Sequence, residues 1–129
     1  MRRVAFLLLF LFATVSGAQA ADTKSRTFVV YFQEWSVGID EDAQKVIAEA
    51  ADMAKANPQS AVRVTGFADP TGSRAANIML SELRALRVSD YLQENGIAKL
   101  RIMLRGKGPV QFAVSSIESR RVEITVKPR

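Results

Sequence analysis

The 129-residue sequence has no cysteine and no histidine, and it has a single tryptophan. Without cysteine the chain can form no disulfide and has no thiol nucleophile. Without histidine it lacks the side chain most often used for acid–base catalysis and for binding metal ions. These absences argue against an enzyme, and we expect neither a cofactor nor a metal site.

Long apolar runs are also scarce, and the one at residues 4–13 is shorter than the roughly 20 residues that cross a bilayer. A basic start at Arg2 and Arg3 precedes it, and small residues at 18–20 follow it, as in a secretory signal. We therefore predict a signal peptide at residues 1–20 and a single exported domain at 21–129, with no transmembrane segment of its own after cleavage. An uncleaved anchor is the alternative, whereas the missing cysteine excludes a lipoprotein anchor.

Charge gives little further guidance. The formal net charge is +5, and it falls to +3 without Arg2 and Arg3. Such an excess is too small to identify an anionic partner. Nucleic acid is not expected as a partner, because the chain is predicted to be exported.

Strand and helix patterns alternate along the predicted domain. Apolar spacings of three and four residues predict two helices, the first between Asp40 and Asn57 and the second from Ser73 or Arg74 to Asn95. Turn residues follow the second and third strands, and the expected strands are 27–32, 61–67, 99–105 and 121–126, with turns at 69–72 and 106–109. This order predicts an α+β fold of two layers, with the helices on one face of a sheet.

Arg84 interrupts an otherwise apolar ridge of the second predicted helix. Leu80, Val88 and Leu92 lie at i,i+4 spacings from it, so this side of the helix should face the core. A guanidinium there either extends to water along a packed aliphatic stem, pairs with a structural carboxylate, or binds a ligand.

Asp69 has two interpretations as well. An aspartate that opens a turn commonly bonds the turn backbone. This turn, however, leads directly into a helix N-terminus, which favours anions. With Arg84 nearby, Asp69 would complete a pair suited to a zwitterion, because Asp69 can accept an ammonium while Arg84 binds a carboxylate. A catalytic carboxylate pair of Asp69 with Glu82 is a weaker alternative.

Three ordered motifs resemble the OmpA C-terminal-like domain family, which includes peptidoglycan-associated lipoprotein and the stator protein MotB. They are Gly66-x-x-Asp69-x-x-Gly72, Asn77-x-x-Leu80-Ser81-x-x-Arg84-Ala85-x-x-Val88-x-x-Tyr91-Leu92 and Arg120-Arg121-Val122-Glu123-Ile124. The similarity covers about residues 27–127, nearly all of the predicted domain.

The resemblance implies a β-α-β-α-β-β sandwich with a four-stranded mixed sheet. It also implies a non-catalytic module that binds the diaminopimelic acid of peptidoglycan in the periplasm, near the cell wall and the outer membrane of a Gram-negative bacterium. The family's ligand-binding roles fall on six positions: Asp69, Thr71, Asn77, Leu80, Arg84 and Arg121. Outer-membrane or other envelope proteins are further expected partners.

The chain departs from the family pattern at several positions. Ser119 replaces a usual asparagine, Phe67-Ala68 replaces a frequent His-Thr pair, and Trp35 stands where acidic residues are common. These departures leave a rival interpretation open, in which an envelope scaffold keeps the fold with a weakened pocket. Trp35 would then be its contact residue, unless this tryptophan is a core side chain.

Overall fold

The computed structural model describes residues 24–109 and 116–128. The predicted signal peptide, residues 1–20, lies outside these ranges and stays a prediction. Within them the chain forms four strands, two long helices and two short helical segments. Their bounds are β1 Arg26–Tyr31, α1 Glu41–Ala56, β2 Ala61–Ala68, α2 Arg74–Glu94, η1 Lys99–Arg101, β3 Ile102–Pro109, α3 Ser116–Ser119 and β4 Arg121–Lys127.

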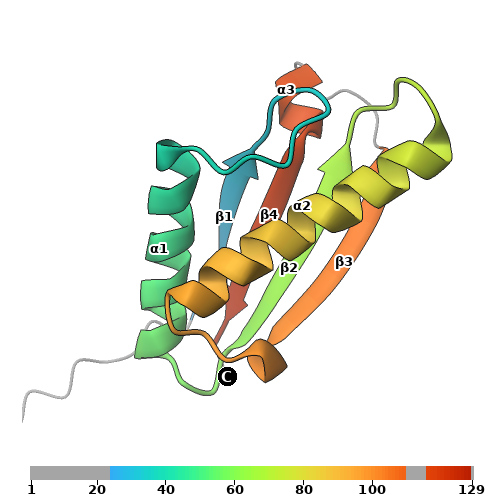
Figure 1. Ribbon diagram of the computed structural model, residues 1–129. Coiled ribbons are helices and arrows are strands. Elements are labelled where there is room, and N and C mark those ends of the chain that lie inside the picture. Colours follow the sequence, from blue (N-terminus) through green and yellow to red (C-terminus); the bar gives the residue numbers. More distant parts are fainter. Residues whose placement is uncertain (1–23, 110–115, 129) are drawn as a thin grey trace, which may run out of the picture.

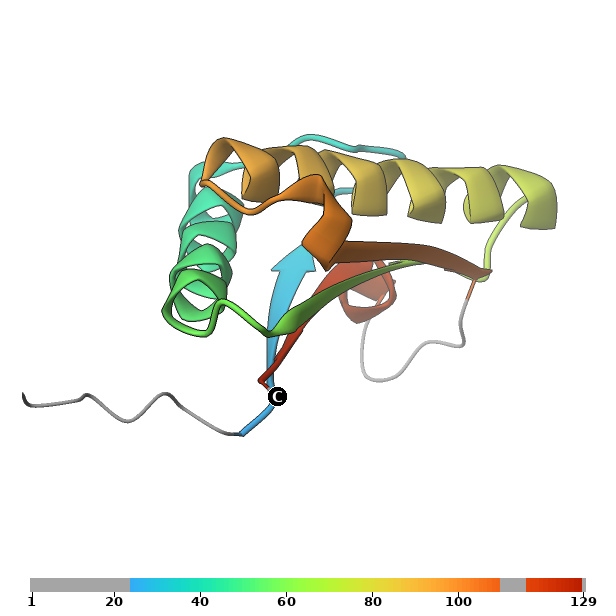
Figure 2. The same ribbon diagram turned by 90° about the horizontal axis from the view of Figure 1, so that it is seen from below.

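The strands form one sheet in the order β1-β4-β2-β3. Strand β4 runs antiparallel to both of its neighbours, whereas β2 and β3 are parallel. Helices α1 and α2 lie on the same face of this sheet, as Figures 1 and 2 show. The predicted α+β sandwich with a mixed four-stranded sheet is therefore confirmed.

Both long helices begin and end at signals that the sequence carries. The side chain of Asp40 accepts a hydrogen bond from the amide of Ala43 and caps α1, while Ser73 caps α2 through the amide of Ala76. Helix α2 ends before Gly96, whose φ of 95° lies in the left-handed region. The helix boundaries expected from the sequence are confirmed to within a residue.

The third strand differs from the prediction. Residues 99–101 form the 3₁₀ segment η1, and the residues expected to turn, 106–109, continue strand β3. Gly106 pairs with Gly66 of β2, so its backbone contributes to the sheet. The glycines that suggested a turn are required here because a helix passes close above them.

Helix α2 approaches the sheet most closely at these two glycines. A Cβ at position 66 would lie 2.0 Å from the backbone oxygen of Ser81, and one at 106 would lie 2.8 Å from the backbone nitrogen of Glu82. Only glycine leaves room for such an approach of two backbones. The contact places the middle of α2, including Arg84, directly over β2.

The apolar core fills the space between the helices and the sheet. Helix α1 contributes mainly alanines, and strands β1, β2 and β4 contribute alternate residues. The largest fully buried apolar side chains are Phe32, Ile47, Leu92, Ile97, Ile124, Val30, Val62, Val64, Val88, Val122 and Val126. Among the described residues, Arg84 is the one charged side chain that is as fully buried as these large apolar side chains.

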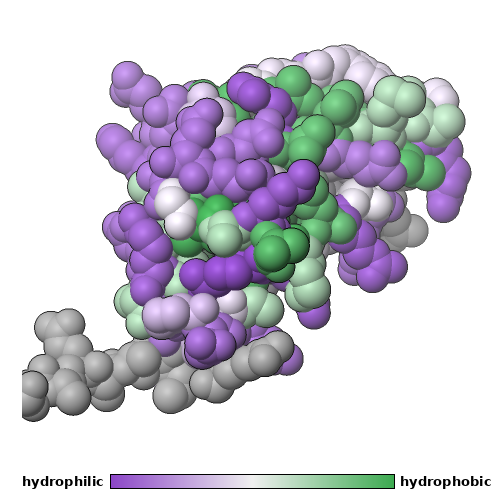
Figure 3. Space-filling model, turned by 60° about the horizontal axis from the view of Figure 1, so that its bottom comes forward, coloured by the Kyte–Doolittle hydropathy of each residue, from purple (hydrophilic) through white to green (hydrophobic). Residues whose placement is uncertain are grey.

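Several large apolar side chains remain exposed. Met79, Leu83 and Leu86 lie on α2, and Leu100 and Leu104 lie on η1 and β3. Figure 3 shows the underside of the molecule, where apolar patches alternate with hydrophilic side chains. In the part of the chain described, no helix combines the length and the apolarity needed to cross a membrane.

The close approach at Gly66 predicts a large effect of a single methyl group. Gly66→Ala should lower the free energy of unfolding by about 3 kcal/mol or more, because the added Cβ would collide with the backbone of α2. Chemical denaturation measures this loss. Gly38→Ala is the matched control, because its Cβ would meet only the Ser36 hydroxyl. Equal losses in both variants would contradict the packing described.

Candidate functional site

A small pocket lies at one end of the sheet. Figure 1 shows that β1 and β2 end and β4 begins at this end. Helix α2 forms one side of it, and the segments after β1 and β2 form the other. Its walls carry two acids and two arginines, and the lining residues are Glu34, Trp35, Asp69, Thr71, Asn77, Leu80, Arg84 and Arg120.

Arg84 is wholly buried and bonded to main-chain carbonyls. Its Nε donates to Ser36 O at 2.9 Å, Nη1 to Phe67 O at 3.3 Å and Nη2 to Gln33 O at 3.0 Å. The guanidinium carbon also lies 5.2 Å from the centre of the Phe32 ring, a cation–π contact. One side chain of α2 thus ties the segment after β1 to the end of β2.

Burial changes the acid–base properties of this group. Desolvation lowers the pKa of Arg84 from its ordinary value to about 10, although the nearby charge of Asp69 raises it, and the charge of Arg120 lowers it further. Arg84 therefore stays protonated at neutral pH. Because its folded-state pKa is depressed, the buried charge costs folding free energy at neutral pH, and this cost falls only above about pH 10.

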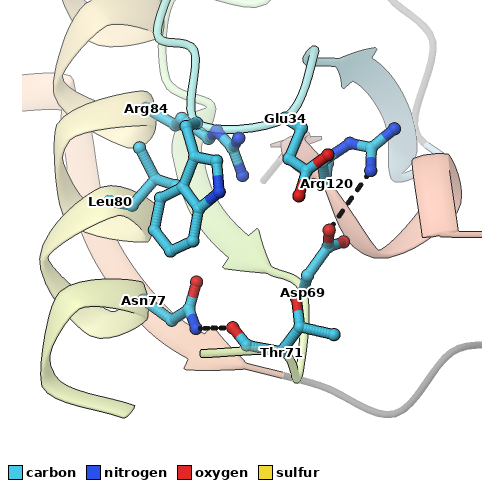
Figure 4. A pocket seen from close by; sticks show the side chains of 8 residues that line it. Glu34, Asp69, Thr71, Asn77, Leu80, Arg84 and Arg120 are labelled. Carbon is cyan, nitrogen blue, oxygen red and sulfur yellow. Dashed lines mark hydrogen bonds and ion pairs between the residues drawn. The ribbon is translucent and has the colours of Figure 1, made fainter. Parts of the chain in front are cut away.

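Asp69 follows β2 and is held on the opposite wall. One carboxylate oxygen accepts from the hydroxyl of Ser119, and the other lies 3.2 Å from Nη1 of Arg120. Arg120 is itself anchored, because its Nε donates to the carbonyl oxygen of Phe32. Figure 4 shows Arg84, Leu80 and Asn77 extending from α2 on one side, with Glu34, Asp69 and Arg120 gathered on the other.

The turn between β2 and α2 is fastened to the helix that it starts. The side-chain amide nitrogen Nδ2 of Asn77 donates to the backbone carbonyl oxygen of Thr71, across the first turn of α2. Gly72 adopts a φ of 84°, a conformation that other residues rarely take. This arrangement holds Thr71 and Asn77 at the rim below Asp69.

The space between these walls is small. It amounts to about 10 Å³, close to the least that holds one water molecule. Trp35 borders it with a half-exposed indole, so the interpretation of this tryptophan as a core residue is wrong. The pocket that Asp69 and Arg84 share is therefore too small for an amino acid in this conformation.

The structure brings together five of the six site residues expected from the sequence. Asp69, Thr71, Asn77, Leu80 and Arg84 all line the pocket, whereas Arg121 does not. Arg121 directly precedes the buried Val122, so strand alternation directs it to the open face of the sheet, where it lies 4.1 Å from the Phe67 ring centre. Its neighbour Arg120 lines the pocket instead, and a ligand-binding role for Arg121 stays a prediction.

Sequence reasoning missed Glu34 and Arg120. The Arg120-Arg121 pair was itself a signal, but which arginine faces the site depends on where β4 begins. Glu82, the other half of the alternative catalytic pair, lies apart from the pocket and packs against Gly106. The structure therefore does not assemble Asp69 and Glu82 into one carboxylate site.

The bonds of Arg84 predict a structural cost when it is replaced. Arg84→Met should lower the free energy of unfolding by about 3 kcal/mol or more, because buried carbonyls that lose their donor each cost roughly 1–3 kcal/mol. Denaturant unfolding measures the loss. Arg87→Met, on the exposed face of the same helix, should change stability by less than about 0.5 kcal/mol. A neutral Arg84→Met substitution would show that these carbonyls do not depend on the guanidinium.

Sequence comparison with curated proteins finds related chains. The peptidoglycan-binding protein ArfA of Mycobacterium tuberculosis is 39% identical over 88 residues, which cover 64% of this chain and 27% of ArfA. The probable lipoprotein YiaD of Escherichia coli is 32% identical over 105 residues, covering 77% of this chain and 48% of YiaD. The chain thus matches about a quarter to a half of the length of these relatives.

Solved structures share the fold. The peptidoglycan-associated lipoprotein from Burkholderia pseudomallei aligns with a TM-score of 0.71 and 22% identity, covering 78% of this chain and 90% of that one. The OmpA-like domain of FopA1 from Francisella tularensis aligns with a TM-score of 0.69 and 26% identity, covering 81% and 73%. The sequence model of the OmpA family matches residues 31–123, and the chain belongs to that family.

Proposed function

We propose that this domain binds cell-wall peptidoglycan, without covalent attachment or catalysis, through the diaminopimelate of the stem peptide. One observation carries the proposal: Asp69 and Arg84, of opposite charge, line the same pocket from opposite walls. The name of the relative ArfA, a peptidoglycan-binding protein, supports the same class of ligand.

Diaminopimelate ends in an ammonium and a carboxylate on one carbon, and the pocket offers a partner for each. Asp69 would accept the ammonium, because each carboxylate oxygen has a further lone pair beyond its bond to Ser119 or Arg120. Arg84 would bind the carboxylate. Three of its five N–H groups hold carbonyls, which leaves one on Nη1 and one on Nη2.

The remaining lining residues would shape the site. Asn77 and Thr71 hold the rim through their mutual hydrogen bond, and Leu80 would contact the aliphatic part of the ligand. Arg120 would hold the Asp69 carboxylate in its orientation. Glu34 adds a second carboxylate on the side where an ammonium would lie.

Export fits this function. A signal peptide at residues 1–20 would deliver the domain to the periplasm, where peptidoglycan lies between the membranes. Relatives named as a probable lipoprotein and as outer membrane protein A support an envelope location and association with outer-membrane proteins.

Asp69→Asn tests the site most cleanly, because the substitution keeps the shape of the side chain and removes its charge. We expect retention on purified sacculi to weaken about tenfold or more, since a charged hydrogen bond contributes roughly 1.5–3 kcal/mol. Co-sedimentation measures retention, and thermal unfolding checks the fold. Asp52→Asn, at an exposed position of α1, serves as control and should bind like wild type. Unchanged retention of Asp69→Asn would refute the site.

Soluble competitors test the ligand itself. A soluble stem peptide containing diaminopimelate should displace the domain from sacculi, whereas the same peptide with lysine in place of diaminopimelate should not. Within a peptide, lysine offers only its side-chain ammonium and lacks the second carboxylate that Arg84 would bind. Equal competition by both compounds would contradict diaminopimelate recognition. The same incubation reports on catalysis, since a hydrolase would release soluble fragments from the sacculi.

The lowered pKa of Arg84 predicts how binding depends on pH. Retention should stay level between about pH 6 and 8, because a group with a pKa of about 10 remains protonated throughout this range. Sacculus co-sedimentation at constant ionic strength measures it. A midpoint near pH 7 would show that some other group controls binding.

An envelope scaffold is the second candidate, and the small volume of the pocket favours it. If the domain is a scaffold that does not bind glycan, Asp69→Asn should still capture its protein partner. Trp35→Ala should fail to capture that partner, because Trp35 is the exposed aromatic beside the site. Pull-down of envelope proteins with both variants distinguishes the two functions.

A further inference from the structure

We propose that Trp35 gates the pocket: its indole covers the space between Asp69 and Arg84 and moves aside when the ligand binds. This inference rests on the proposed function. It adds the residue that controls access to the site.

The size of the pocket requires a movement. A carbon bearing an ammonium and a carboxylate is several times larger than the one water that about 10 Å³ holds. The Arg84 side chain, moreover, has no exposed surface. A ligand therefore reaches both charges only if part of the wall is displaced.

Most of the wall is firmly held. Asn77, Leu80 and Arg84 belong to α2, which packs on the glycines of β2 and β3. Asp69 and Arg120 bind each other, and Arg120 also binds the carbonyl of Phe32. Asn77, Arg84, Asp69 and Arg120 are thus each held by a side-chain hydrogen bond.

Trp35 is the exposed aromatic side chain of the wall. It lies in the segment between β1 and α1, outside regular secondary structure. Its side chain is 56% exposed, and no hydrogen bond holds its indole within the described residues. Its φ of 53° falls in the left-handed region, which costs a residue other than glycine free energy. The backbone at Trp35 is thus strained, and its indole is free of hydrogen bonds to the described residues.

The indole rests on Gly72 at the opposite rim. A Cβ at position 72 would lie 3.4 Å from Cη2 of Trp35. The ring therefore packs closely against a residue that has no side chain. The contact spans the pocket from the segment after β1 to the turn before α2. Displacing this one ring would open the pocket at its exposed side.

Arg84 couples the gate to the ligand. Its Nη2 and Nε bind the carbonyls of Gln33 and Ser36, which flank Trp35 on both sides. A ligand carboxylate is a stronger acceptor than a neutral carbonyl. Binding it would weaken the hold of Arg84 on this segment and favour the displaced position of Trp35.

Trp35 is the sole tryptophan of the chain, so its fluorescence reports directly on the gate. A soluble stem peptide containing diaminopimelate should change the emission of the wild-type protein as it binds. In stopped-flow measurements with a labelled peptide, Trp35→Ala should associate at least about threefold faster, because no closed state competes with the ligand. Trp35→Gly should also associate faster than wild type, and glycine at this position adopts the positive φ without strain.

Tyr31→Ala is the control, since Tyr31 is a half-exposed aromatic that does not line the pocket. It should associate at the wild-type rate. Binding at equal rates by wild type, Trp35→Ala and Trp35→Gly would overturn the gate while leaving peptidoglycan recognition intact, as would binding without a change in wild-type emission. If none of these proteins binds the peptide, the proposed function fails and the gate fails with it.

Discussion

The buried guanidinium of Arg84 is the interaction on which the rest of the site depends. It stands on the core side of α2 and donates to carbonyls of three residues that lie far away in the sequence. Gln33 and Ser36 belong to the irregular segment after β1, and Phe67 lies at the end of β2, where the register of its pairing with β3 shifts. Buried carbonyls need donors. Arg84 therefore replaces the secondary structure that this end of the sheet lacks.

The guanidinium of Arg84 would thus serve both the fold, through its bonds to carbonyls, and the proposed ligand, through its remaining N–H groups. A fully buried charge is costly, and the depressed pKa of Arg84 reflects that cost. Hydrogen bonds to three carbonyls and the face of Phe32 offset it. Asp69 follows the same logic, because Ser119, at a position where asparagine is usual in the family, still supplies a polar hydrogen to the carboxylate. That departure therefore preserves the anchor.

Local patterns in the sequence were reliable wherever the deciding interaction was local. Asp40, Ser73 and Gly96 mark helix ends through bonds or dihedral angles within a few residues. They failed at 106–109 because glycine is suited both to turns and to close backbone contacts, and only the approach of α2 distinguishes the two. They also failed for Trp35, since an isolated aromatic in an irregular segment has no periodicity to show its burial.

The sequence by itself determined the α+β architecture, the helix ends and the pair of Asp69 and Arg84, because periodicity, capping and motif spacing are written along the chain. Tertiary structure alone decided that Arg120 faces the pocket and Arg121 the open face, that Arg84 holds main-chain carbonyls, and that Trp35 borders the pocket with an exposed indole. The physical reason is that these outcomes depend on groups separated by about fifty residues in the chain, such as Ser36 and Arg84 or Asp69 and Arg120. Their distances are set only when the layers pack.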